Sequence, residues 1–326
     1  MIDPAPVIDS IYAFRRSKAM FSAVALGVFD RLEESPAGPE AFEGNRSAIE
    51  RLLDTCVALG FLEKSGALYS NTPVASEYLR RKSPRTLAGY ILYSNAALYP
   101  MWGHLEEALS TGENRWQATF GFGPGGLFDH YFHTDEAKRT FIAGMHGFGL
   151  LSSPKVAAAF DLSNFHRLVD LGGATGHLAL SAVDHYPALS AAVFDLPAVA
   201  EIAREYSEGR IDVLEGDFFA DALPPADLYA LGRIIHDWSE PKIRLLLAKI
   251  HEALPEAGAL LLAETLLDDD KSGPLDSLLQ SMNMLVCTEG KERTVAEYRA
   301  LLEEAGFSKV EGRRTGAPLD AVLAWK

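Results

Sequence analysis

Residues 168–176 read Leu-Val-Asp-Leu-Gly-Gly-Ala-Thr-Gly, an apolar run that ends in a glycine-rich turn. The run Leu168–Leu171 predicts a buried strand, and glycines directly after a strand let the backbone approach a ligand closely. In doubly wound sheets such a turn lies at the carboxyl end of the first strand, where these folds bind cofactors. The stretch therefore predicts the beginning of a cofactor-binding domain.

The sequence after residue 167 alternates short apolar runs with amphipathic helical patterns. This alternation predicts an α/β fold, a Rossmann-like doubly wound parallel sheet covered by helices on both sides. Thr294-Val295-Ala296-Glu297 is a capping box that opens a helix. The strand candidates are Ala191–Phe194, Ile211–Leu214, Leu228–Leu231 and Ala259–Ala263, with Lys309–Arg313 and Ala321–Trp325 as late additions; one intervening helix has Ile243, Leu246, Leu247, Ile250 and Leu254 on one face.

The first third of the chain has a helical pattern instead. Ser47-Ala48-Ile49-Glu50 fits a capping box, Gly60 ends the helix that follows, and residues 61–64 and 67–70 fit a short hairpin. A helix followed by a hairpin is typical of a winged-helix unit. A chain of 326 residues exceeds what one core usually spans. We expect three segments: a winged-helix-like domain at 1–95, a helical connector at 96–158 and a Rossmann-like domain at 159–326.

Charge and composition limit the function classes. The net charge is −15; residues 1–95 hold eleven basic and eleven acidic side chains, whereas the remainder holds nineteen and thirty-four. An acidic second part argues against nucleic-acid binding through that part. We expect no membrane span and no secretory signal, because no apolar stretch is long enough to cross a bilayer and the first residues lack a basic start. Cys56 and Cys287 suggest neither a disulfide framework nor a zinc site, so we expect a cytoplasmic protein.

Two acids follow the next strands and fit an adenosine-containing ligand. Asp195 comes nineteen residues after Gly176 at the end of a strand, where its carboxylate can accept hydrogen bonds from ribose hydroxyls. The glycines read G-G-A-T-G and lack the final G-x-x-G step of dinucleotide binders, which favours a ligand without phosphates such as S-adenosylmethionine. Gly216-Asp217-Phe218-Phe219 offers an acid for the adenine amino group and a ring for its face. The alternative interpretation is that the turn only packs tightly.

The fourth strand is followed by Arg233-Ile234-Ile235-His236-Asp237-Trp238. A histidine with an unperturbed pKa near 6.5 can accept a proton at neutral pH, and methyl transfer from a sulfonium needs a deprotonated, aligned hydroxyl and no metal. No His, Cys or carboxylate cluster in the sequence has metal-ligand spacing. Histidine bases work best when a partner fixes the tautomer. Asp237, Glu264 and Glu292 are the candidates, and the sequence does not choose among them.

Several segments together resemble the acetylserotonin (hydroxyindole) O-methyltransferases and, more broadly, the plant-type and bacterial small-molecule O-methyltransferases. The N-terminal segments that carry the resemblance are Ala25–Asp30 and Trp102–Leu105. The later ones are Ala159–Ser163, Asp170–Gly176, Phe194–Pro197, Gly216–Phe219, Arg233–Trp238, Ser281–Val286 and Thr288–Thr294.

The resemblance implies a class I methyltransferase domain, an N-terminal homodimerisation domain, S-adenosylmethionine as cofactor, S-adenosylhomocysteine as product, and a small, hydroxylated, aromatic acceptor. It implies that His236 is the base, flanked by Asp237, Glu264 and Glu292. The expected cofactor contacts are Tyr131, Asp170, Gly172, Gly173, Gly176, Asp195, Leu196, Gly216, Asp217, Phe218 and Arg233. The expected acceptor contacts are Met145, Asp237, Asn283, Met284 and Cys287.

The sequence departs from that family pattern at three positions. The second glycine of the motif is Ala174, a cofactor-contacting tryptophan of the hydroxyindole enzymes aligns with Gly149, and a substrate-contacting glutamine aligns with Cys287. A backbone-lined pocket should tolerate Ala174. The other two changes leave the base and the cofactor site intact but argue against N-acetylserotonin as the acceptor, which stays open.

Two other functions compete with methyl transfer. A methyltransferase fold can use the cofactor in decarboxylation, hydroxylation or ring closure, although the intact histidine argues against this. A winged helix can bind DNA, but Ser47–Gly60 has only Arg46 and Arg51 beside Glu50 and Asp54, which is a poor match to phosphates.

Overall fold

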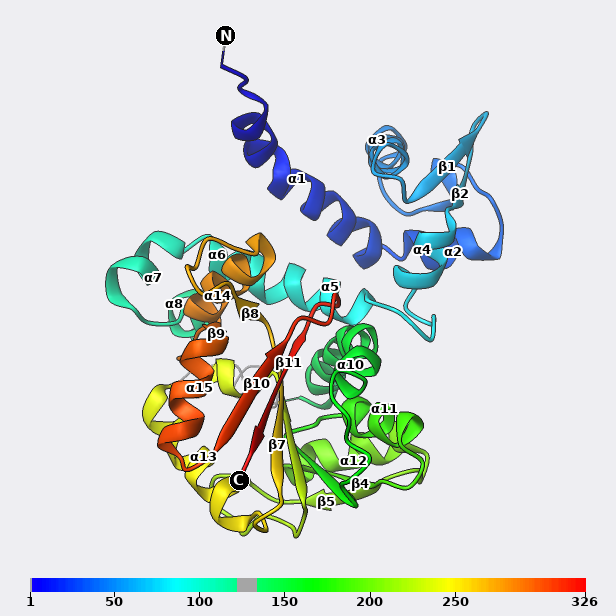
Figure 1. The fold of residues 1–326 in the computed structure, drawn as a ribbon. Coiled ribbons are helices and arrows are strands. Elements are labelled where there is room, and N and C mark those ends of the chain that lie inside the picture. Colours follow the sequence, from blue (N-terminus) through cyan, green and yellow to red (C-terminus); the bar gives the residue numbers. More distant parts are fainter. Residues whose placement is uncertain (1, 122–133) are drawn as a thin grey trace. The chain divides into compact units, whose positions relative to one another are not determined.

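The computed structural model describes residues 2–121 and 134–326 (Figure 1). The contacts within the chain divide it into two compact units, Met1–Pro100 and Met101–Lys326. The division into three segments, with boundaries at 95 and 158, stays a prediction. Among the described residues no helix is both long enough and apolar enough to cross a bilayer.

The first unit is mainly helical and has one hairpin. Its core consists of side chains from the second half of α1, from α2 and α3, and from the hairpin, with Val28, Phe29 and Leu53 almost fully buried. Its elements are α1 (Ala5–Ala25), α2 (Val28–Glu34), the 3-10 turn η1 (Pro39–Ala41), α3 (Arg46–Ala58), β1 (Leu62–Ser65), β2 (Leu68–Asn71), α4 (Pro73–Tyr78), α5 (Ala88–Tyr93) and the π-helical turn η2 (Ser94–Leu98), with α6 (Tyr99–Trp102) at the boundary.

The expected helix and hairpin are both present, but two local details were wrong. Asn45, not Ser47, caps α3: its Oδ1 accepts the backbone N–H of Ala48 at 3.0 Å. Asn45 is in the extended conformation directly before the first helical residue, which is the geometry that an N-cap requires. The strands begin one residue later than predicted, because Gly66 takes the positive φ (+60°) inside the turn.

The second unit contains a seven-stranded sheet in the order β10-β11-β7-β6-β3-β4-β5. The five strands from β7 to β5 are parallel, as predicted, whereas β10 and β11 are antiparallel additions at one edge and make the sheet mixed. The strands are β3 (Arg167–Leu171), β4 (Ser190–Asp195), β5 (Asp212–Glu215), β6 (Leu228–Gly232), β7 (Ala259–Glu264), β10 (Lys309–Arg313) and β11 (Asp320–Trp325); β8 (Leu266–Leu267) and β9 (Arg293–Thr294) form a separate parallel pair.

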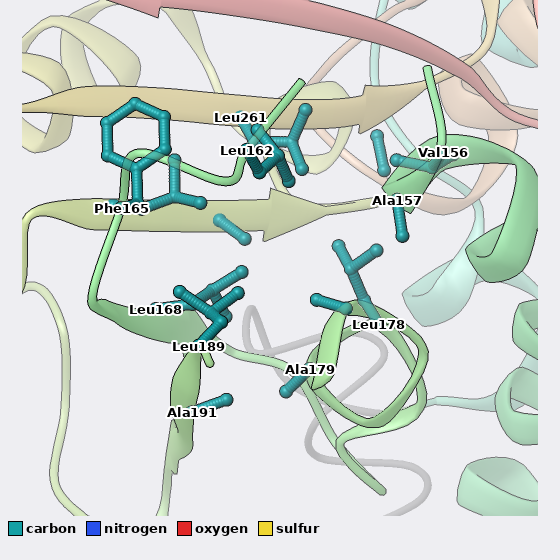
Figure 2. Close-up of a cluster of buried hydrophobic side chains, with 14 of the residues drawn as sticks. Val156, Ala157, Leu162, Phe165, Leu168, Leu178, Ala179, Leu189, Ala191 and Leu261 are labelled. Atoms are coloured by element: carbon teal, nitrogen blue, oxygen red, sulfur yellow. The ribbon is translucent and has the colours of Figure 1, made fainter. Parts of the chain in front are cut away.

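Successive residues of the sheet strands contribute to two different cores, because strand side chains alternate between the two faces. On one face Leu168 and Leu261 pack with Leu178 of α11 and Val156 of α10 (Figure 2). On the other face Val169, Leu171 and Leu260 pack with side chains of α13 and α15. The helices among the described residues of this unit are α7 (Leu105–Thr111), α8 (Trp116–Phe120), α10 (Asp135–Ala157), α11 (His177–His185), α12 (Pro197–Ser207), η3 (Ile235–Asp237), α13 (Glu240–Ala253), α14 (Leu275–Cys287) and α15 (Val295–Glu304).

This topology positions the site. Strand β3 pairs with β4 on one side and with β6 on the other, so the chain direction across the sheet reverses at β3. Crevices at such reversals, outside the carboxyl ends of the strands, are where doubly wound sheets bind ligands. The predicted site residues after β3, β4, β5, β6 and β7 therefore share one edge of the sheet.

Candidate active site

The glycine-rich turn after β3 is closely packed and lies against the segment that contains His236. Gly172 has φ +68°, and a Cβ atom there would lie 2.7 Å from Cδ1 of Ile234 and 3.1 Å from a ring carbon of Phe218. Only glycine fits such a position. Ile234 is two residues before His236, and Phe218 belongs to the loop after β5. The turn, that loop and the histidine segment thus meet, as the sequence predicted.

Two acids support the turn, one buried and one half-buried. Asp195 accepts the N–H of Ala174 at 2.9 Å and that of Leu196 at 2.8 Å, and burial raises its pKa to about 6. Asp170 is almost fully buried, and its carboxyl group is packed against Gly173. In the described part of the chain no donor reaches either carboxyl oxygen in good hydrogen-bond geometry. Burial raises the Asp170 pKa to about 7. Asp170 therefore packs against the turn from the protein interior, whereas the side chain of Asp195 is partly accessible to solvent.

Two further predicted cofactor residues have unused polar groups. Asp217 Oδ1 accepts the N–H of Phe219 at 2.7 Å, which leaves Oδ2 available. Arg233 has a positive φ of 57°, and its guanidinium lies 5.2 Å from the ring centre of Phe148. Its buried Nε has no hydrogen-bond partner among the residues that the structure describes. Within the described ranges no acid pairs with this guanidinium. A carboxylate-bearing ligand would satisfy it.

His236 lies among three carboxylates. Its Nδ1 is 2.7 Å from Glu292 Oε1 and 3.4 Å from Glu264 Oε2, and its Nε2 is 3.6 Å from Asp237 Oδ1. The side chain is buried, as are those of both glutamates. The sequence left open which acid orients the ring; of the three, Glu292 is the one within hydrogen-bond distance of Nδ1.

The carboxylates dominate the electrostatics of the histidine. Burial alone would lower the His236 pKa, but the charges of Glu292, Glu264 and Asp237 outweigh it and raise the pKa. Burial in turn raises the pKa of Asp237 to about 6 and that of Glu264 above its ordinary value. The three carboxylates therefore favour the protonated form of the imidazole.

Backbone contacts fix the histidine segment from two sides. Glu264 Oε1 accepts the N–H groups of Ile234 at 3.1 Å and Ile235 at 2.9 Å, so the end of β7 holds the turn after β6. On the other side Gly290 packs so tightly against the carbonyl of His236 that a Cβ would collide with it. These contacts hold the backbone of the histidine segment in place.

The structure also brings together a group that sequence spacing did not reveal. One ligand atom each of His236, Glu264 and Glu292 lies within 4.8 Å of the others, which is a grouping that can hold a metal ion. The three residues come from separate elements, so no local motif connects them. Their observed interaction is a direct Nδ1–Oε1 hydrogen bond of 2.7 Å, shorter than the roughly 3.3 Å between two ligands of one tetrahedral ion. Independence from metal stays a prediction.

The predicted acceptor contacts are only partly brought together. Asn283, Met284 and Cys287 lie on α14 and are buried. The Trp102 indole donates to Asn283 Oδ1 at 2.9 Å, and because that N–H can only donate, the amide oxygen must face it. Cys287 donates its thiol to the Asn283 carbonyl, so it is engaged within the helix. Met145 is half-buried on α10, and no described contact connects it to His236.

Tyr131 lies outside the described residues.

Sequence reasoning missed polar groups that the structure places at or beside the turn. His146 Nδ1 lies 2.8 Å from the buried Thr175 hydroxyl within the turn, and His177 Nδ1 lies 2.8 Å from the Ser153 hydroxyl. Burial lowers the pKa of both histidines, to about 4 and about 3. His177 directly follows Gly176, a signal that was available in the sequence.

Comparison with known proteins settles the family. The O-methyltransferase domain family matches residues 102–308, and the O-methyltransferase dimerisation domain family matches residues 8–81. The chain belongs to the O-methyltransferase family. Acetylserotonin O-methyltransferase of Bos taurus is 44% identical over 327 residues, which cover 96% of this chain and 95% of that protein.

Two solved structures show how closely this O-methyltransferase follows known ones. Human N-acetylserotonin methyltransferase, in complex with S-adenosylmethionine, superposes with a TM-score of 0.95 at 39% identity and covers 100% of this chain and 98% of its own. The mitomycin 7-O-methyltransferase MmcR superposes with a TM-score of 0.86 at 26% identity and covers 99% and 97%. The predicted fold and the predicted class, an S-adenosylmethionine-dependent O-methyltransferase, are confirmed.

Proposed function

We propose that this O-methyltransferase methylates a hydroxyl group of a small aromatic molecule, with His236 as the general base. The observation that carries the proposal is the orientation of the imidazole. Nδ1 is hydrogen-bonded to Glu292 at 2.7 Å, whereas Nε2 forms no hydrogen bond within the described ranges. In the neutral ring the proton on Nδ1 is thereby fixed, and the lone pair on Nε2 is free to accept another.

The proton path follows from this arrangement. The hydroxyl of the acceptor gives its proton to Nε2, and Glu292 and Glu264 stabilise the resulting imidazolium. The two glutamates and the tight contact at Gly290 hold the ring, so little reorganisation is needed when it becomes charged. When bound, S-adenosylmethionine supplies an electrophilic methyl group.

The residues around the glycine turn fit that cofactor. Asp195 uses one lone pair of each oxygen on backbone donors, so a lone pair of each remains for ribose hydroxyls. The ring of Phe218 lies beside Gly172, where a flat base can stack, and Asp217 Oδ2 can accept from an exocyclic amine. The guanidinium of Arg233, whose Nε has no hydrogen-bond partner among the described residues, suits the carboxylate of a methionine moiety.

The remaining cofactor contacts, Tyr131, Asp170, Gly173, Gly176, Leu196 and Gly216, are part of the same proposal. Asp170 and Gly173 act by shaping the turn, since the acid is nearly inaccessible.

The acceptor site is proposed to include α14. Trp102 occupies the amide oxygen of Asn283, which leaves the amide NH₂ as the group that can donate to an acceptor molecule. Met284 and Met145 would contribute apolar walls, as is usual in small-molecule sites. The similarity to acetylserotonin O-methyltransferases supports a hydroxyindole or related phenol.

We also propose a homodimer in a reducing, cytoplasmic setting. The dimerisation-domain family covers residues 8–81, and the first turns of α1 expose Ile8, Ile11 and Phe14 by 44%, 53% and 52%. A second copy would cover such a stripe. Cys56 and Cys287 are both unpaired and buried. Sedimentation tests the dimer, and a monomer at micromolar concentration would contradict it.

The experiment for the proposed function is transfer of labelled methyl from S-adenosylmethionine to a panel of hydroxyindoles, phenols and aliphatic alcohols. We expect label on the oxygen of an aromatic hydroxyl. Binding of the cofactor without label in any hydroxyl compound would contradict the proposal and favour an atypical use of the cofactor.

A further inference from the structure

One ammonium group organises the loop after β5. The side chain of Lys249, on α13, lies partly buried and donates from Nζ to the carbonyl of Phe218 at 2.8 Å, to that of Phe219 at 3.1 Å and to that of Asp221. An ammonium has three N–H donors, so all are used on this one loop. No carboxylate in the described parts of the chain pairs with Nζ.

The loop is itself a closed turn. Asp217 accepts through its carbonyl from Ala220 at 3.0 Å and from Asp221 at 2.7 Å, and the Asp221 carboxylate accepts the Asp217 N–H at 2.8 Å. These bonds form the turn but do not attach it to the rest of the domain. Lys249 attaches it by hydrogen bonds from a helix on one face of the sheet to three carbonyls of the turn. The other attachments are the Gly216 N–H, which donates to the Asp195 carbonyl at 3.0 Å, and the packing of the two phenylalanine rings.

The position of this loop matters for both halves of the site. Phe218 lies against the glycine turn at Gly172, and the ring of Phe219 packs edge-on against Trp238, with centroids 5.1 Å apart. Trp238 is two residues after His236. A displacement of the loop would therefore move the surface beside the glycine turn without directly changing the hydrogen bond of the histidine.

We propose that Lys249 is a positioning residue for cofactor binding: its ammonium gathers the carbonyls of residues 218, 219 and 221 and so fixes the orientation of Asp217 and Phe218 toward the adenosine part of the ligand. This inference rests on the proposed function, because it takes the loop after β5 as a cofactor contact. A neutral side chain of the same length leaves three carbonyls without their donor, whereas an arginine can still donate to them.

The test compares Lys249→Met with Lys249→Arg and with Lys155→Met, which removes an exposed lysine from α10 in the same unit. S-adenosylhomocysteine binding is measured by calorimetry, and methyl transfer gives KM and kcat. For Lys249→Met we expect the Kd for S-adenosylhomocysteine and the KM for S-adenosylmethionine to rise about tenfold, with kcat and the KM of the acceptor within about twofold. Lys249→Arg should restore most of the affinity, and Lys155→Met should match the wild type.

The outcomes separate the two proposals. If the wild type binds no S-adenosylhomocysteine, the proposed function fails, whatever the variants do. If the wild type binds and Lys249→Met binds equally well, or loses kcat as much as affinity, the positioning role is overturned. If Lys249→Met does not fold, Lys249→Gln replaces it. Should that variant also be recovered only unfolded, the lysine serves the stability of the domain and the proposal is again overturned.

Discussion

The bond between Glu292 and His236 offers the sharpest perturbation of the proposed base. In Glu292→Gln the side chain keeps its shape and its oxygen can still accept from Nδ1, but the negative charge 2.7 Å from the ring is lost. Because that charge helps to raise the His236 pKa, its removal should lower the pKa and weaken the base.

The size of the effect follows from the type of bond. A hydrogen bond to a charged group contributes about 1.5–3 kcal/mol, which corresponds to a loss of about 10- to 150-fold in kcat/KM if the charge acts mainly in the transition state. The residual activity reflects Glu264, whose Oε2 remains 3.4 Å from the same nitrogen.

The assay is a pH profile of kcat/KM for methyl transfer. In the wild type the rate should rise with pH, because a raised pKa keeps the ring protonated at neutral pH. In Glu292→Gln the plateau should be lower but be reached at a lower pH. Glu303→Gln, an exposed position on α15, is the matched control and should follow the wild type. A Glu292→Gln profile with unchanged height and midpoint would refute this reasoning.

Three further substitutions test other parts of the account. Asp170→Asn should raise the free energy of unfolding of the cofactor-free protein at pH 8 by up to about 4 kcal/mol. Burial raises the carboxyl pKa from 3.8 to about 7, so ionisation above pH 3.8 costs folding free energy that the amide does not. Chemical denaturation should show a smaller increase in stability at pH 5, and an unchanged stability at pH 8 would contradict this prediction. Gly172→Ala should lower the affinity for S-adenosylhomocysteine at least tenfold in calorimetry, since the added Cβ lies 2.7 Å from the Ile234 side chain at a positive φ. Wild-type affinity in this variant would show that the turn at Gly172 does not contact the cofactor. Asn283→Leu should raise the acceptor KM about tenfold and leave cofactor affinity unchanged, because the amide that Trp102 orients is lost; an unchanged KM would remove it from the acceptor site.

Much of the catalytic unit could be predicted because its signals are local. Alternating apolar runs indicate strands, glycines after a strand indicate a turn, and both signals are contained in a few consecutive residues. The parallel topology then places Asp195, Asp217, His236 and Glu264 at one edge without any knowledge of side-chain contacts. The strands β10 and β11 were predicted, but their antiparallel direction was not, since strand direction is not encoded in periodicity.

The contacts that the sequence did not reveal join residues far apart in the chain. Trp102 and Asn283 are 181 positions apart, and Lys249 meets Phe218 across 31. Such pairs depend on how helices pack on the sheet. A local choice can also be ambiguous: Asn45 and Ser47 are both good caps, and only the observed hydrogen bond selects Asn45.

The measurement that tests the central claim most directly is methyl transfer by His236→Ala, with S-adenosylhomocysteine affinity measured on the same preparation. We expect nearly all turnover to be lost, while the affinity for the demethylated cofactor stays within a few-fold of the wild type. Wild-type turnover in this variant, with the cofactor bound normally, would show that the imidazole at 236 is not the base.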